Sequence, residues 1–193
     1  MKVISITGTP CTGKTTIAKK LSKELNYLHL EINEVIKENG LHNGYDKKRQ
    51  CYIVDVGNLN KHLIHIIRFF ESLENTKNLK LDKSIKKGII IDSHLSHYLP
   101  KDYVDLCIVM VCDLKTLQKR LKKRKYSQQK ISENMDAEIF DVCLNEAKAA
   151  GHRVIVISST KDIKTKPLSL LLRGGFNESA GRRIKYNNKK RES

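Results

Sequence analysis

The sequence predicts an α/β fold, a three-layer sandwich in which helices cover both faces of a five-stranded parallel sheet. Short runs rich in Val and Ile alternate with longer stretches of helical periodicity, which is typical of parallel strands joined by crossover helices. Most of the strand candidates show little alternation of polar and apolar residues, as expected for strands that are covered on both faces. The five candidates are residues 2–7, 27–30, 88–92, 106–111 and 153–157.

Apolar residues at helical spacing predict the helices between these strands. Residues 14–25 are expected to form the first helix after the first strand, and apolar side chains form one stripe over residues 59–70 and a shorter one over residues 114–121. A further helix is expected from about residue 131 to residue 150. Gly151 would end it, at the position where helices favour a left-handed residue.

Two segments interrupt this alternation. Residues 38–46, with Gly40, Asn43 and Gly44, indicate a loop rich in turn formers. Residues 119–130 are basic and carry Tyr126 and Ser127 at their middle. Taken alone, this basic stretch is explained at least as well by a solvated helix end as by a binding site.

The length and composition favour one compact domain with an anionic partner. The chain has 193 residues, 39% of them hydrophobic, and a formal net charge of +16. This charge favours a nucleotide, RNA or acidic protein surface as partner. We expect a single domain over residues 1–161. Periodicity weakens after it, and residues 162–193 are expected to form a C-terminal extension with a basic tail that is poorly ordered alone.

Other features bear on location. No apolar run approaches the roughly 18 residues of a membrane span, and the first residues lack the pattern of a signal peptide. The five cysteines contain no CxxC pair, which argues against a disulfide framework or a zinc site and for a reducing compartment. We expect a cytoplasmic protein without a membrane partner. In a eukaryote, a nuclear location is also compatible with the sequence.

The segment Gly8-Thr9-Pro10-Cys11-Thr12-Gly13-Lys14-Thr15 matches the phosphate-binding pattern G-x-x-x-x-G-K-[ST]. It lies between a predicted buried strand and a predicted helix, where such a loop can turn its backbone N–H groups around phosphates. Lys14 would then reach the β and γ phosphates, and the Thr15 hydroxyl would reach Mg²⁺. A thiol nucleophile at Cys11 is less favoured than a packing role, because no paired base is visible beside it.

Asp92 ends the apolar run Gly88-Ile89-Ile90-Ile91. A carboxylate at the end of such a strand lies at the carboxyl edge of a parallel sheet, beside a phosphate-binding loop. We expect it to hold Mg²⁺, partly through water. A strand-terminal Asp can equally be a helix cap, and the phosphate-binding motif decides for the metal. His94 is a candidate for orienting a water or a phosphate, although a lone histidine is more often structural.

These residues resemble the adenylate kinases of the isoenzyme-six type, small P-loop enzymes linked to maturation of the small ribosomal subunit. The resemblance covers most of residues 1–161. It rests on the phosphate-binding motif; on Gly44-Tyr45-Asp46 with Ile53-Val54-Asp55; on Asp92-Ser93-His94; and on Arg124-Lys125-Tyr126-Ser127 with Lys130-Ile131 and Glu133-Asn134.

The resemblance implies a P-loop sheet with strand order 2-3-1-4-5, a monophosphate-binding region near residues 31–54 and a short lid near residues 123–133. It implies an ATP site formed by Cys11, Gly13, Lys14, Thr15 and Thr16, with Arg124 folding over the phosphates and Lys161 near the adenine. The sequence departs from the family at Cys11, where glycine is usual. Arg49 matches no family residue, and it is as compatible with solvation as with gripping an acceptor phosphate.

Function follows as an expectation. The resemblance implies a kinase that converts ATP and AMP to two ADP, with accompanying ATPase activity. It also implies a role in maturing the small-subunit rRNA and a small-subunit ribosomal protein of the uS11 type as partner, with pre-rRNA contact as a further expectation. The alternative is an ATP-driven assembly factor whose kinase activity is secondary. A kinase for a non-nucleotide molecule is a third reading. The sequence does not rank AMP against CMP or dAMP.

Overall fold

The computed structural model describes residues 1–75, 87–160 and 165–173. Its centre is a five-stranded parallel sheet in the order β2-β5-β1-β6-β7. The strands are β1 (Lys2–Thr7), β2 (Leu28–Glu31), β5 (Gly88–Asp92), β6 (Leu106–Val111) and β7 (Val154–Ser158). Counted among themselves along the chain, these strands have the order 2-3-1-4-5. The predicted fold class and strand order are confirmed.

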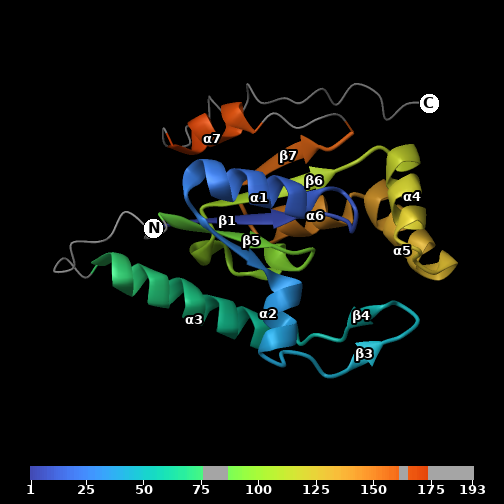
Figure 1. Cartoon of the computed structure of the whole chain (residues 1–193), viewed down its shortest axis with the longest axis horizontal. Helices are drawn as coiled ribbons and strands as arrows, with labels where there is room; N and C mark the ends of the chain where they lie inside the picture. Colours follow the sequence, from blue (N-terminus) through green and yellow to red (C-terminus); the bar gives the residue numbers. More distant parts are fainter. Residues whose placement is uncertain (76–86, 161–164, 174–193) are drawn as a thin grey trace.

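Helices cover both faces of the sheet (Figure 1). One core cluster joins α1 (Lys14–Leu25) and α7 (Lys166–Arg173) to one face, and it includes Ile4 and Ile6 of β1. On the other face, Val3 packs with α2 (Ile32–Glu38) and α3 (Val56–Asn75). Successive side chains of a strand point to opposite faces, and β1 is buried from Val3 to Thr7 because both of its faces are covered.

The helix predicted over residues 131–150 is wrong as a single element. The structure has α5 (Gln128–Ile139) and α6 (Val142–Ala149), separated by Phe140 and Asp141. Asp141 adopts a left-handed conformation with φ of 51°, which Asp tolerates better than most residues. This break lets Ala147 of α6 pack against β6. The predicted end is confirmed, because Gly151 has φ of 77°.

The region between β2 and α3 contains elements that the sequence did not reveal. Helix α2 follows β2, and a short hairpin pairs β3 (Tyr45–Asp46) with β4 (Cys51–Tyr52). The predicted loop lies between them and turns at Gly40 and Gly44, both at positive φ. The hairpin strands are two residues long each, too short for a periodic signal.

The remaining elements are α4 (Leu114–Lys123) and two short 3₁₀ turns, Ser96–Tyr98 and Lys101–Tyr103. Helix α7 falls in the predicted C-terminal extension, and its Leu168 and Leu172 are buried against α1 and the sheet. The basic tail lies outside the described residues. No described helix has the length and apolar character needed to span a bilayer.

Candidate nucleotide-binding site

The turn between β1 and α1 is held in shape by two glycines at positive φ. Gly8 has φ of 135°, and a Cβ there would lie 2.3 Å from the carbonyl oxygen of Met110 on β6. Gly13 has φ of 90° and is the N-cap of α1. Inside the turn, Thr12 Oγ1 donates to Thr9 O at 2.8 Å. Gly8 is therefore required by close packing on the sheet.

Lys14 folds back over this turn. Its Nζ donates to Gly8 O at 2.9 Å and to Thr9 O at 3.0 Å. Burial lowers the pKa of Lys14, an effect that the charge of Asp92 partly opposes. Among the ion pairs of the described residues, none includes Lys14. A desolvated ammonium whose partners are neutral carbonyls would gain from an anionic ligand, so it fits a polyphosphate.

The start of α1 adds to this anion site. Gly13 provides no side-chain cap, and the first turn of the helix carries no acidic residue. The unpaired N–H groups and the positive end of the helix dipole are thus available to a phosphate.

A cleft with a cavity volume of about 1080 Å³ opens in front of this turn. The cleft brings together eight of the predicted site residues: Cys11, Gly13, Lys14, Thr15, Thr16, Asp92, His94 and Arg124. Its other walls come from the ends of β2 and β5, from α2 and the β3–β4 hairpin, and from α4 and the segment after it. The ninth predicted residue, Lys161, lies outside the described residues.

Asp92 ends β5 beside the phosphate-binding turn, with a side chain only 2% exposed. Its Oδ2 lies 3.3 Å from Nε2 of His29 on the neighbouring strand β2. A buried carboxylate and the Thr15 hydroxyl are oxygen donors of the kind Mg²⁺ prefers, and both line the cleft. In the described residues no group of three His, Cys, Asp or Glu side chains could hold a metal by itself. The donor set therefore fits Mg²⁺ that arrives with nucleotide phosphates.

His94 also lines the cleft. Burial lowers its pKa to about 4, and the nearby charge of Lys14 acts in the same direction. The imidazole is therefore neutral at pH 7. A neutral ring of such low basicity can accept a hydrogen bond and orient a water or phosphate, but it is a weak proton acceptor.

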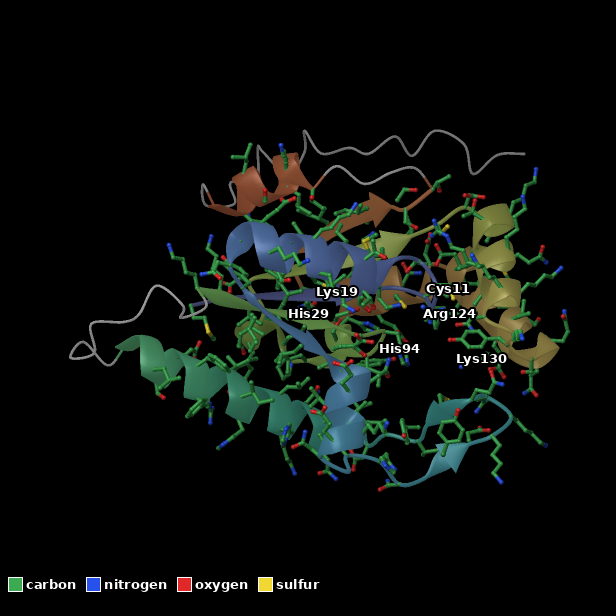
Figure 2. The ribbon with its side chains drawn as sticks, in the orientation of Figure 1. Cys11, Lys19, His29, His94, Arg124 and Lys130 are labelled. Carbon is green, nitrogen blue, oxygen red and sulfur yellow. The ribbon has the colours of Figure 1, made fainter. Side chains whose placement is uncertain are left out.

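Cys11 and Arg124 both line the cleft, and Figure 2 labels them close to each other. Cys11 holds a left-handed conformation with φ of 70°, which glycine adopts more readily than other residues. Burial raises the pKa of its thiol, which agrees with packing rather than nucleophilic chemistry. Arg124 is exposed and donates to the Tyr126 hydroxyl at 3.4 Å, a contact that raises its pKa.

Arg120 is a site residue that sequence reasoning missed. Its Nη1 donates to Ser159 Oγ at 2.9 Å and to Cys11 O at 3.3 Å, and its Nη2 donates to Ser159 O at 3.0 Å. It thereby ties α4 to the phosphate-binding turn and to the segment after β7. The available signal was its position one helical turn before Arg124.

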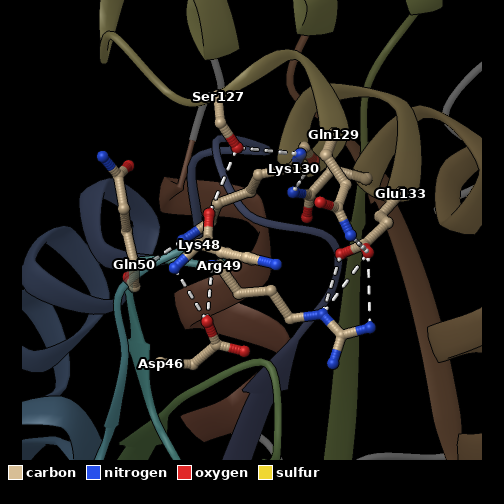
Figure 3. Close-up of polar contacts among 9 residues, drawn as sticks. Asp46, Lys48, Arg49, Gln50, Ser127, Gln129, Lys130 and Glu133 are labelled. Atoms are coloured by element: carbon tan, nitrogen blue, oxygen red, sulfur yellow. Dashed lines mark hydrogen bonds and ion pairs between the residues drawn. The ribbon is translucent and has the colours of Figure 1, made fainter.

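The β3–β4 hairpin is connected to α5 across the cleft (Figure 3). Arg49 Nε lies 3.3 Å from both carboxylate oxygens of Glu133. Ser127 Oγ donates to Lys48 O at 3.2 Å, and Lys130 Nζ donates to Gln50 O at 3.1 Å. We call these three contacts the hairpin–lid bridge. Arg49 therefore contacts Glu133, whereas the alternatives from the sequence were solvation and gripping an acceptor phosphate.

Comparisons with known proteins identify the family of this chain. Residues 4–141 match the family model described as AAA domain. The chain is 37% identical to the adenylate kinase isoenzyme 6 homolog of Dictyostelium discoideum over 154 residues, covering 80% of this chain and 78% of that protein. It is 36% identical to the homolog of Schizosaccharomyces pombe, again over 80% of this chain and 78% of that protein.

Solved structures share the fold at low identity. Shikimate kinase from Acinetobacter baumannii matches with a TM-score of 0.52 and 13% identity, covering 92% of this chain and 96% of that one. The YorR protein of Bacillus subtilis matches with a TM-score of 0.51 and 17% identity, covering 91% of this chain and all of that one. With the phosphate-binding turn, the strand order and these relatives taken together, the chain belongs to the adenylate kinase isoenzyme 6 family of P-loop proteins.

Proposed function

We propose that this protein is a nucleoside monophosphate kinase that transfers the γ-phosphoryl group of MgATP to AMP and releases two ADP. The observation that carries the proposal is the single cleft shared by two sets of residues. The phosphate-binding turn and the lid residues line one part of it, and residues 31–54 supply the other through Glu31, Asn33 and the hairpin. A donor and an acceptor phosphate can therefore meet in one space.

The proposed roles follow from the chemistry of phosphoryl transfer, which depends on positioning and on neutralising charge. Lys14 and the backbone amides of the turn bind the donor phosphates. Arg124 extends over the cleft from the C-terminus of α4, and its guanidinium gives bidentate contacts to the transferred group. Thr15 and Asp92 would hold the Mg²⁺ that binds with ATP, and the ion would offset the negative charge of the phosphates. Lys161 as an adenine contact stays a prediction.

An accompanying ATPase activity is part of the proposal. The segment between α4 and α5 is short, because Lys123 ends one helix and Gln128 begins the next. A lid of this size leaves water access to the donor phosphate, and closure around substrates is what excludes water in kinases. His94, neutral at pH 7, would orient the attacking water.

The test is a coupled assay of ADP formation with a panel of monophosphates, on the wild type and on Lys14→Ala. We expect AMP-dependent turnover that falls by at least about a hundredfold in the variant, because charge stabilisation at the transferring phosphate is lost. Substantial activity of Lys14→Ala would contradict the donor-site assignment. Turnover that no monophosphate stimulates would instead support a kinase for a non-nucleotide acceptor.

A second candidate is favoured by the net charge of +16. In this reading the nucleotide cycle drives assembly of the small ribosomal subunit, through a ribosomal protein of the uS11 type and contact with pre-rRNA. Phosphate contacts make RNA affinity fall steeply with salt. ATPase activity stimulated by the ribosomal protein would support this role. So would a salt-sensitive RNA affinity that is lost on deleting residues 181–193.

A further inference from the structure

A histidine outside the nucleotide cavity contacts the carboxylate that the site offers to Mg²⁺. The contact joins His29 Nε2 to Asp92 Oδ2 at 3.3 Å. The Asp92 side chain is 2% exposed and that of His29 is 16% exposed. Asp92 lines the cavity, whereas His29 is not among the described residues that line it. The imidazole therefore supports the carboxylate without reaching the nucleotide space. Figure 2 labels His29 and, at the cleft, His94.

The pairing of β2 with β5 creates this contact. In the parallel register His29 lies beside Ile90, and Glu31 lies beside Asp92. Paired residues of neighbouring strands share a face of the sheet, so His29 is the diagonal neighbour of Asp92 on that face. No local motif announces this pair, because 63 residues separate its members.

The contact has a direct electrostatic consequence. A buried carboxylate needs hydrogen-bond donors, and among the described side chains His29 is the one that lies within hydrogen-bond distance of Asp92. Donation from Nε2 fixes Oδ2 and leaves the other oxygen of Asp92 for the cavity. Hydrogen-bond partners of this kind orient a metal-binding carboxylate, and their loss typically lowers metal affinity about 10–100-fold.

We propose that His29 is a positioning residue for Asp92, and that it sets how strongly the site holds the magnesium–nucleotide complex. The proposal rests on the proposed function, because Asp92 can act on Mg²⁺ only if the cavity binds a nucleotide. His29 touches neither substrate nor the reacting atoms. Its effect is expected in the magnesium dependence of nucleotide binding, which is separate from binding of the nucleotide itself.

The experiment measures binding of a non-hydrolysable ATP analogue by calorimetry, at a series of Mg²⁺ concentrations and in EDTA. We expect His29→Leu to raise about tenfold the Mg²⁺ concentration that gives half of the magnesium-dependent gain in analogue affinity. The affinity for the analogue in EDTA should stay near the wild-type value. His29→Gln places an amide N–H at a similar reach and should retain most of the wild-type magnesium dependence. His29→Asn, which is too short to reach Oδ2, should behave like His29→Leu.

The matched control is His65→Leu, the same change at an exposed histidine of α3, and it should leave both affinities unchanged. An unaltered magnesium dependence in His29→Leu would overturn the proposal, as would equal losses in His29→Gln and His29→Leu. If the leucine variant does not fold, the comparison of His29→Gln with His29→Asn decides. A wild type that binds no nucleotide would overturn the proposed function, and the role of His29 with it. If the wild type binds the nucleotide and the His29 substitutions leave its magnesium dependence unchanged, only the role of His29 is overturned.

Discussion

Gly8 shows how closely the phosphate-binding turn is packed on the sheet. An alanine Cβ at Gly8 would overlap the Met110 carbonyl oxygen, whereas one at Gly44 would meet nothing within 4 Å, although φ is nearly the same at 135° and 136°. We expect Gly44→Ala to lower the free energy of unfolding by about 1–3 kcal/mol through backbone strain alone. Gly8→Ala should cost clearly more, because the steric overlap adds to that strain.

Urea denaturation of the two variants checks this difference. Equal losses of stability at Gly8 and Gly44 would show that backbone strain explains both positions and that the approach to β6 costs nothing. Affinity for ATP should fall only in Gly8→Ala, since only Gly8 belongs to the phosphate-binding turn.

His97 provides a prediction about pH. It is 1% exposed, its Nδ1 lies 2.7 Å from Thr7 Oγ1, and its Nε2 lies 2.9 Å from Glu146 Oε2. Burial lowers its pKa below 6.5, and Glu146 partly opposes this shift. Below pH 6.5 the unfolded chain therefore binds more protons than the folded one, and stability should fall as the pH falls.

The measurement is the free energy of unfolding at pH 7.5 and at pH 5.5. Glu146→Gln removes the charge that opposes the shift, so the loss between these two pH values should be larger in the variant. An equal or smaller loss in the variant would argue against a lowered pKa at His97.

At the scale of single residues, the sequence was sufficient to place the residues that a local motif marks. The phosphate-binding turn follows β1 directly and Asp92 ends β5, so a short segment was enough to predict the position of each. Arg120 and His29 were not predicted, because their partners Ser159 and Asp92 are 39 and 63 residues away. Such contacts are set by strand order and register, which a short segment does not encode.

At the scale of elements, the hairpin–lid bridge joins the two walls of the cleft through an exposed ion pair. The Arg49 and Glu133 side chains are 57% and 41% exposed, so the pair is expected to contribute about 0.2–1 kcal/mol and to weaken with salt. Arg49→Glu should speed release of a bound fluorescent ATP analogue up to about fivefold, because about 1 kcal/mol corresponds to a fivefold change in rate and like charges then face each other.

Stopped-flow dissociation tests this expectation. Combining Arg49→Glu with Glu133→Arg should restore slow release, since the pair is re-formed with its charges exchanged. Lys47→Glu makes the same charge change in the same turn at an exposed residue and should have little effect. Release that Arg49→Glu and Lys47→Glu alter equally would indicate a general charge effect instead.

Long elements with a clear pattern of apolar and polar residues were the most predictable from the sequence. The long helices and the sheet strands agree with the sequence within a few residues, because a dozen residues of periodicity outweigh local exceptions. The sequence does not predict the helix break at Asp141, because neither glycine nor proline marks it. It is fixed by tertiary contacts, such as the backbone N–H of Cys112 donating to the buried Glu138 at 2.7 Å. The hairpin strands are stabilised by tertiary contacts as well, since Tyr52 packs on the core cluster of α2 and α3.

At the scale of the whole molecule, helix α7 extends the folded unit beyond the boundary at Lys161 that the sequence suggested. Leu168 is 3% exposed in the core shared with α1, whereas Leu170 on the same helix is 67% exposed. Leu168→Ala should lower the free energy of unfolding by about 2–5 kcal/mol, because it leaves a cavity in this core. Leu170→Ala should change it by less than about 0.5 kcal/mol.

Thermal or urea unfolding of both variants compares the two sites directly. A Leu168→Ala variant as stable as Leu170→Ala would mean that α7 does not contribute to the core, and that the domain ends near Lys161 as the sequence suggested.

The topology also has a consequence for synthesis of the chain. β1 is the central strand of the sheet and lies between β5 and β6, yet it precedes both by more than 80 residues. A ribosome therefore delivers the middle of the sheet long before its neighbours, and loop closure must await them. The phosphate-binding turn packs Gly8 against Met110 of β6, so it cannot reach its folded form on the nascent chain until β6 has emerged. Early translation products therefore carry the motif without the packing that shapes it.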